Sequence, residues 1–315
     1  MENVKRKSEA VTWLRCIAAL LIVNSHFGPL YPDGLWALSF GGLFGNCLFM
    51  LISGYCFSRI NDPFPRWLLK RLIRIYIPYF LFMLLRIQIY DTDEVTVFNL
   101  LLPIERYHFI ASILTLYPVW YLISWLNKNT KIKYRYILVF LIVVQISYYY
   151  LAFDYQSYGL YKHYNLFELL SYTAVMTLGA IMAEGQYLKN PKASAAGVLV
   201  AFGVYTFLEF SALPPEFTIV NWYVSAAFGF FLSSFFLSIE DKLPAWKPVT
   251  TISTLTLDMY LVQFALIQLY RTYAFPTGYI LCAIAIFATA YSLHWLSDKI
   301  SGFLLKKLTG RPQKT

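Results

Sequence analysis

Charged residues are scarce in this 315-residue chain: Asp, Glu, Lys and Arg make up 14% of it, against about 25% in an average soluble domain. No polar stretch is long enough to form a separate soluble domain. Hydrophobic residues reach 58% and aromatic residues 19%. This composition excludes an ordinary soluble enzyme, and it predicts a single membrane-embedded domain that covers residues 1–315.

Cysteine is also rare, and the four cysteines form no recognisable ligand set. There is no CxxC and no Cys/His spacing suited to zinc. All four lie inside apolar runs, so we interpret them as small buried hydrophobic residues and expect no metal site. They are Cys16, Cys47, Cys56 and Cys282.

Positive charge exceeds negative charge, with a formal net charge of +9. In a soluble protein this excess would suggest a nucleic-acid partner. Here the Lys and Arg residues form short clusters between apolar runs, so we attribute them to membrane topology and expect no nucleic-acid partner.

Ten apolar runs are long enough to be helices that cross a bilayer, which takes about 20 mostly apolar residues each. The predicted fold is therefore all-α, a polytopic transmembrane helical bundle of about ten spans. The predicted spans are residues 10–30, 36–58, 72–90, 108–126, 134–152, 166–184, 194–211, 218–239, 252–270 and 279–297.

The distribution of basic residues predicts the orientation of these spans. With the N-terminus in the cytoplasm, 21 Lys and Arg residues fall in cytoplasmic segments and 4 in outer segments. Residues 5–7 are basic and precede an apolar run, as in a signal peptide, but the run contains Arg15 and no clear cleavage site. We therefore expect a retained first helix and two cytoplasmic termini.

Arg15 and His26 lie within the first span, 11 residues apart. At about 100° per residue they share one helix face, roughly 16 Å apart along the axis. An Arg inside a span costs about 2.5 kcal/mol or more, so it must face protein or water. Arg suits phosphate or other anions, and His exchanges protons near neutral pH. The alternative is an Arg that extends its charge to the interface and a His that is hydrogen-bonded there.

Two further segments carry polar residues that a lipid-facing helix does not need. Residues 53–55, Ser-Gly-Tyr, indicate a point where two helices approach closely. Lys70, Arg71 and Arg74 cluster at the cytoplasmic start of the third span, and Arg71 and Arg74 share a helix face. The cluster is either an anion site or a topology anchor.

Other ionisable residues lie in or near the spans. Asp258 is about two turns into its span, and it either lines a cavity, as a partner of Arg15 or His26, or has no such role. Two further carboxylates and two further histidines near span ends are interpreted as interfacial or structural. They are Glu168, Glu209, His163 and His294.

Taken together, these motifs resemble acyltransferase family three, the integral-membrane acyltransferases that modify bacterial surface polysaccharides. The spacing of Arg15 and His26 matches the first-helix signature of that family, and the resemblance spans about residues 10–265. The other matching motifs are Phe49 with Ser53-Gly54-Tyr55, Arg71-x-x-Arg74 followed by Ile77-Pro78, residues 107–118, and Tyr260-Leu261-Val262-Gln263.

The chain departs from the family pattern at three positions. Thr12 stands where the family often has Asp three residues before the Arg. His108 stands where Trp is common, and Gln263 replaces the usual late His.

The resemblance implies an enzyme of the bacterial inner membrane. Its donor co-substrate would be acetyl-coenzyme A, or another acyl-coenzyme A, on the cytoplasmic side. Its acceptor would be a hydroxyl of a surface glycan or lipid-linked sugar on the outer face. Under this resemblance His26 is the general base, and Arg71 and Arg74 bind the donor phosphates. Arg15 acts on the pantetheine or phosphate end of the donor, deeper in a slot lined by the helix face that it shares with His26.

Several roles stay open at this point. Transient acylation of His26 is an alternative to base catalysis. A transporter or flippase for a glycan or lipid-linked sugar is the alternative function, and a sensor or scaffold is disfavoured because no sizeable loop is present. Candidate substrate contacts are Ser53, Tyr55, His108 and Asp258, and candidates that polarise the acyl carbonyl are Asn24, Ser25 and Tyr55.

Overall fold

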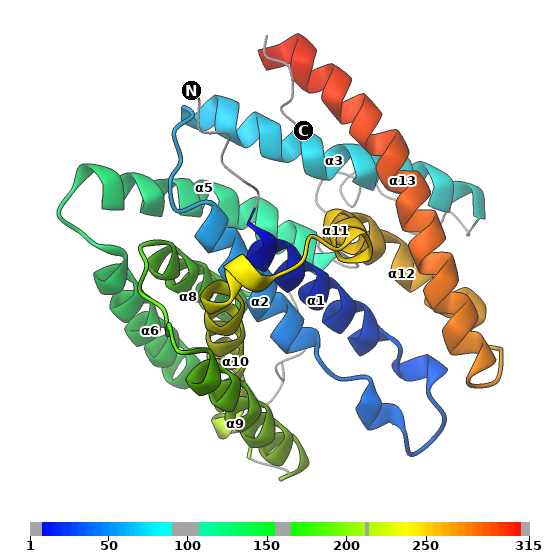
Figure 1. Cartoon of the computed structure of the whole chain (residues 1–315), viewed down its shortest axis with the longest axis horizontal. Coiled ribbons are helices and arrows are strands. Elements are labelled where there is room, and N and C mark those ends of the chain that lie inside the picture. Colours follow the sequence, from blue (N-terminus) through cyan, green and yellow to red (C-terminus); the bar gives the residue numbers. More distant parts are fainter. Residues whose placement is uncertain (1–7, 90–106, 155–164, 212–213, 310–315) are drawn as a thin grey trace. The chain divides into compact units, whose positions relative to one another are not determined.

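The computed structural model describes residues 8–89, 107–154, 165–211 and 214–309. Over these residues the protein is helical and contains no strand, which confirms the all-α prediction (Figure 1). The α-helices are α1 (Glu9–His26), α2 (Gly42–Cys56), α3 (Phe64–Ile89), α5 (His108–Asn129), α6 (Tyr134–Leu151), α8 (Leu166–Ala183), α9 (Pro191–Phe210), α10 (Ile219–Ser238), α11 (Lys247–Thr254), α12 (Thr256–Tyr270) and α13 (Thr277–Thr309). The short 3₁₀ helices are η1 (Gly28–Leu30), η2 (Trp36–Leu38), η3 (Pro215–Phe217) and η4 (Glu240–Lys242).

Each of the ten predicted spans coincides with helical structure. Within the described residues, seven segments are long and apolar enough to cross a membrane, or eight if α11 and α12 form one span. The count of ten spans and the cytoplasmic position of both termini stay predictions. The largest boundary difference is in α13, which continues to Thr309 instead of ending near residue 297.

The prediction of one continuous helix over residues 252–270 is wrong, because the helix is broken at Leu255. Threonine hydroxyls on α11 bond to backbone carbonyls of the same turn. Thr254 donates to the carbonyl of Thr251 at 2.7 Å, and Thr251 donates to that of Lys247 at 2.9 Å. Such side-chain bonds compete with the regular ladder and bend helices.

The chain divides into two compact units. The first consists of Met1–Ile22, Gly41–Arg59 and Ile123–Thr254. The second consists of Val23–Phe40, Ile60–Leu122 and Leu255–Thr315.

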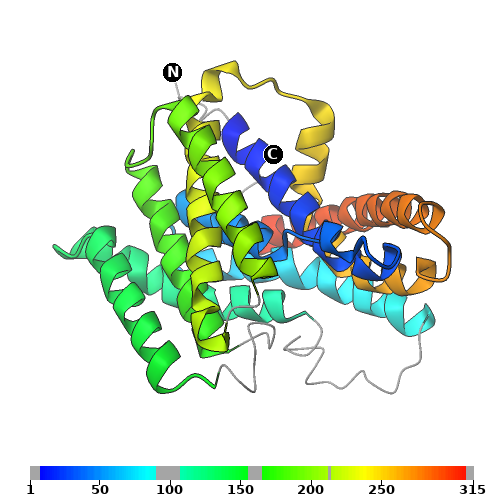
Figure 2. The same ribbon diagram turned by 90° about the horizontal axis from the view of Figure 1, so that it is seen from below.

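In the first unit, α2 packs against α8 and α10, α6 packs against α8, and α9 lies beside α10 (Figure 2). A buried apolar cluster joins α1 to α2. It consists of Leu14 and Ala18 from α1 with Leu48 and Ile52 from α2.

Glycines let α2 and α8 approach at backbone distance. A Cβ on Gly54 would overlap the carbonyl of Met176 on α8, and a Cβ on Gly179 would overlap the carbonyl of Leu51 on α2. Small residues permit this kind of contact between membrane helices. The predicted close approach at the Ser-Gly-Tyr segment is confirmed.

Gly54→Ala should therefore force α2 and α8 apart and lower the yield and melting temperature of folded protein. The matched control is Gly203→Ala on α9, where a Cβ meets nothing within 4 Å. Alanine there should stabilise the helix by roughly 0.5–1 kcal/mol. Thermal unfolding in detergent checks both variants, and equal melting temperatures would contradict the packing argument.

In the second unit, α12 and α13 pack along each other, and both contact α3 (Figure 1). The 3₁₀ helix η1, which begins two residues after the end of α1, also packs against α12. The C-terminal residue of α1 is thereby placed beside α12.

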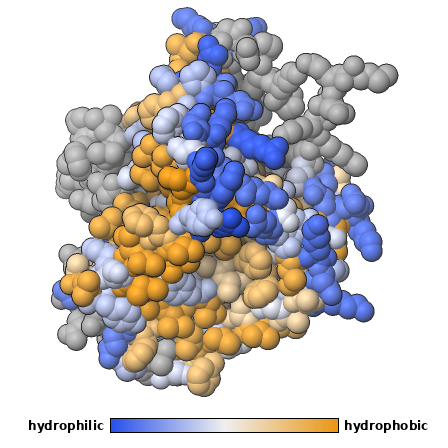
Figure 3. Space-filling model, turned by 90° about the vertical axis from the view of Figure 1, so that its left-hand side faces the viewer, coloured by the Kyte–Doolittle hydropathy of each residue, from blue (hydrophilic) through white to orange (hydrophobic). Residues whose placement is uncertain are grey.

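Large hydrophobic side chains are exposed along α6 and α9. Phe140 is 65% exposed, Leu199 72% and Phe207 70%. Figure 3 shows one face of the molecule on which hydrophobic side chains cover wide areas. A helix that exposes such residues along its length needs an apolar solvent, which agrees with a multi-pass membrane protein.

Candidate functional site

His26 is the last residue of α1 and belongs to the second unit. Its half-buried ring packs edge-on against Phe264 of α12, with ring centroids 4.6 Å apart. Phe264 also contacts the rings of Tyr107 and Tyr260. Aromatic packing therefore fixes the position of the predicted base.

The same aromatic cluster reaches α3. Tyr107 lies just before α5, and its ring contacts Tyr79 and Phe82 of α3 as well as Tyr260 of α12. Tyr79, Tyr107 and Tyr260 are all buried. The cluster joins the helix that carries Arg71 and Arg74 to the surroundings of His26.

Asn24 holds the loop that follows α1. Its side-chain amide donates to the carbonyls of Leu38 at 2.7 Å and Phe40 at 3.0 Å, and its oxygen accepts from Tyr31 Oη at 2.9 Å. Burial, followed by hydrogen bonding to Tyr279, raises the pKa of Tyr31 to about 12, so its phenol stays protonated and donates. Asn24 is fully occupied, which removes it from the candidates that polarise a substrate carbonyl.

The three cations at the start of α3 have different surroundings. Lys70 pairs with Asp62 at 2.6 Å, so its charge is compensated. The Arg71 guanidinium lies over the Trp67 ring, 5.5 Å from its centroid. Arg74 is exposed on the next turn. Arg71 and Arg74 therefore present positive charge on one side of α3, in the same unit as His26.

Arg15 belongs to the first unit, although it lies on α1 with His26 as predicted. It is half-buried, and its Nη2 donates to Cys56 Sγ at 3.7 Å. One turn earlier, Thr12 is buried and bonds to the carbonyl of Ser8 at 3.1 Å. The hydroxyl that replaces the expected Asp thus stays within its own helix.

The weaker substrate candidates are spread over both units. Ser53 donates its hydroxyl to the carbonyl of Phe49 at 2.8 Å, so this donor is used within α2. Tyr55 is half-buried on the same helix, in the first unit. His108 is the first residue of α5, half-buried, in the second unit.

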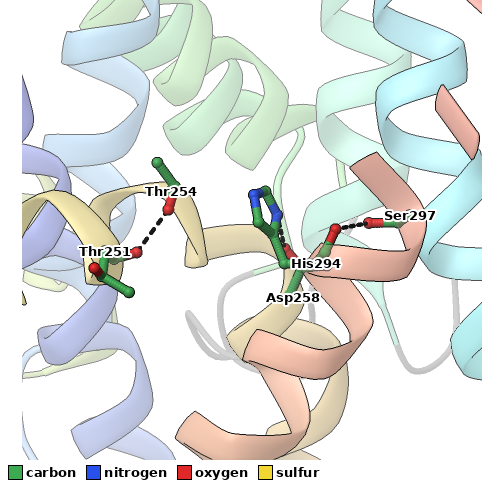
Figure 4. A network of polar contacts seen from close by, with 5 residues as sticks. All are labelled: Thr251, Thr254, Asp258, His294 and Ser297. Atoms are coloured by element: carbon green, nitrogen blue, oxygen red, sulfur yellow. Dashed lines mark hydrogen bonds and ion pairs between the residues drawn. The ribbon is translucent and has the colours of Figure 1, made fainter. Parts of the chain in front are cut away.

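Asp258 is buried on α12, and its partner is on α13. Its Oδ2 lies 2.9 Å from Nδ1 of His294 (Figure 4). The predicted pairing of Asp258 with Arg15 or His26 is not what the structure shows, and His294 is more than a span-end residue. Asp258 and His294 are 36 positions apart in the sequence, and they meet because α12 and α13 are consecutive helices that pack along each other. The sequence indicated that Asp258 has a partner, because a carboxylate within a span needs a hydrogen-bond donor, but it did not indicate which residue that partner is.

Asp258→Leu should lower the stability of the protein by about 0.5–1.5 kcal/mol, because the half-exposed His294 ring loses its hydrogen-bond partner. Asp258→Asn should be milder because its side-chain oxygen still accepts. Asp298→Asn, at an exposed position of α13, is the control. Melting temperatures in one detergent check this order, and a Leu variant as stable as the control would contradict it.

The two carboxylates that were predicted to be interfacial, Glu168 and Glu209, differ in exposure. Glu168 is 4% exposed and accepts a hydrogen bond from Tyr172 Oη at 2.7 Å, so the prediction of a solvated interfacial group is wrong. Its position at the start of α8 favours an acid, because the helix dipole is positive there. Glu209 is exposed, as predicted. His163 lies outside the described residues.

Gln263 has an environment that the sequence did not reveal. It is fully buried on α12, one residue before Phe264, and neither polar atom of its carboxamide has a hydrogen-bond partner among the residues that the structure describes. In the described part of the chain, no three His, Cys, Asp or Glu side chains gather as a metal-ligand set.

The fold and these residues define a multi-pass helical membrane protein in which one unit contains both His26 and the Arg71/Arg74 pair. A family model described as an acyltransferase domain matches residues 8–296. The chain belongs to this family, acyltransferase family three, whose activity is membrane acyl transfer. Neither the curated proteins nor the solved structures contain a match.

Proposed function

We propose that the protein transfers an acetyl or similar acyl group from cytoplasmic acyl-coenzyme A to a hydroxyl of a surface glycan or lipid-linked sugar. The transfer would take place in a bacterial inner membrane. The observation that carries the proposal is the family match over residues 8–296, which includes both the Arg15/His26 and the Arg71/Arg74 motifs.

Arg71 and Arg74 are proposed to bind the donor phosphates. Phosphate oxygens only accept hydrogen bonds, and guanidinium groups supply several donors in a fixed planar arrangement. Lys70 contributes less because Asp62 already neutralises it. Arg15 is proposed to contact the pantetheine or phosphate end of the donor.

His26 is proposed to act as the general base. It removes the proton of the acceptor hydroxyl as the oxygen attacks the thioester carbonyl carbon. The tetrahedral intermediate then expels the thiolate of coenzyme A, and the C–S bond breaks. The thiolate takes the proton from His26, which leaves an ester, free coenzyme A and neutral His26. General-base action of this kind contributes about 10²–10⁴-fold to the rate.

The proposal is tested with membrane vesicles from cells that make the protein, supplied with acetyl-labelled acetyl-coenzyme A at the cytoplasmic face. Label that appears as base-labile ester in the glycan fraction, and not in vesicles without the protein, is the expected result. Glycan that crosses the membrane without gaining label would favour the flippase and would contradict acyl transfer.

A further inference from the structure

The carboxamide of Gln263 is unusual for a membrane helix. The side chain is 0% exposed, and both Nε2 and Oε1 lack a partner among the described residues. Burying an amide without hydrogen bonds costs about 1–3 kcal/mol on protein scales. Leucine or methionine would fill the same space without that cost. Unsatisfied buried groups of this kind call for a functional explanation or a bound water.

The position of Gln263 points to the acyl-transfer chemistry. The next residue, Phe264, carries the ring that packs on His26 at 4.6 Å. The helix α12 also contacts η1, which follows His26 in the chain. On α12, Gln263 lies roughly 140° around the axis from Asp258, so it does not share the face that pairs with His294.

We propose that Gln263 donates its Nε2–H to the oxygen of the acyl carbonyl and stabilises the oxyanion that forms during acyl transfer. This inference rests on the proposed function. When the acceptor oxygen attacks, the carbonyl π bond becomes a lone pair on that oxygen, and the negative charge needs a donor. The Gln263 carboxamide is buried and has no partner among the described residues, so its N–H is available for this bond.

The other side chains considered for this role are less suitable. Asn24 already makes three hydrogen bonds that hold the loop after α1. Tyr55 is only half-buried, so water competes for its hydroxyl. Gln263 therefore combines an N–H that has no partner among the described residues with a place in the chain next to Phe264, whose ring packs on the base.

The test compares Gln263→Leu and Gln263→His with the wild type in the acetyl-coenzyme A vesicle assay, with donor Kd measured on purified protein. Loss of one oxyanion donor lowers kcat by about 10²–10³-fold. We expect a loss of that size in the Leu variant, with an unchanged donor Kd and an unchanged or higher melting temperature. The His variant keeps an N–H donor and should retain most of the rate.

Gln145→Leu is the matched control. Gln145 is also buried, on α6, but its amide is satisfied by Ser171 and Tyr223. This variant should lose stability, because its partners are left unpaired, and keep its kcat per folded molecule. Comparison of Gln145→Leu with Gln263→Leu therefore separates a loss of protein stability from a loss of transition-state stabilisation.

The outcomes separate this inference from the proposed function. Wild-type transfer with an equal rate in Gln263→Leu would overturn the oxyanion role and indicate a buried water. A raised donor Kd with an unchanged kcat in Gln263→Leu would also overturn the oxyanion role, because Gln263 would then stabilise the bound donor and not the transition state. Failure of the wild type itself to bind donor or transfer acetyl would refute the proposed function.

Discussion

Replacing His26 with alanine should lower acetyl transfer by about 10²–10⁴-fold, the contribution expected of a general base. Donor binding should survive, because Arg71 and Arg74 lie on a different helix, more than one turn before the Tyr79 contact with the aromatic cluster. The measurement is the initial rate of ester formation in vesicles, together with acetyl-coenzyme A binding to the purified variant.

His26→Phe separates the proton chemistry of His26 from its packing. Phenylalanine keeps an aromatic ring against Phe264 but accepts no proton, so the variant should fold like the wild type and be as inactive as the alanine variant. Substantial transfer by folded His26→Phe protein would refute the base assignment. Loss of donor binding in either variant would instead indicate that His26 shapes the donor site.

The helices could be predicted from the sequence because the bilayer imposes a simple rule. Every backbone group in lipid must be bonded within its own segment, so long apolar runs become helices. This rule located α6, α8 and α10 to within about two residues. It failed at Leu255, because hydropathy does not register the local bonds that Thr251 and Thr254 make to backbone carbonyls.

The candidate site could be predicted only where its residues share one helix. The spacing of Arg71 and Arg74 fixes their common face, and the presence of Arg15 and His26 on one helix follows from their span, although α1 ends at His26 and not near residue 30. Contacts between residues on different helices could not be predicted in this way. The bond from Asp258 to His294 depends on how α12 packs against α13, which neither helix determines alone.

Gln263 illustrates the same limit more sharply. In the sequence it is a departure from the family pattern, and a polar residue within a span can face a partner, a cavity or water. Only the packing of α12 shows that its carboxamide is buried and lacks a partner among the described residues. An orphaned polar atom is a property of the assembled helices, so it cannot be predicted from periodicity or composition.

Replacing Arg71 and Arg74 together with glutamine should weaken acetyl-coenzyme A binding by about a hundredfold. Hydrogen bonds to charged groups contribute about 1.5–3 kcal/mol each, and 1.4 kcal/mol is a factor of ten in Kd. We take the lower end, about 3 kcal/mol for the pair, because Arg74 is exposed and its charge is screened. The measurement is calorimetric titration of detergent-purified protein at moderate salt.

The control for this variant is Lys131→Gln with Lys133→Gln, which removes the same charge from an exposed segment between α5 and α6. Binding should be nearly unchanged in the control, since a specific phosphate contact requires more than net charge. The difference in Kd between wild type and the arginine variant should shrink as salt is raised, because exposed charges are screened. Equal weakening in both double variants would assign the effect to general electrostatics and leave Arg71 and Arg74 as topology anchors.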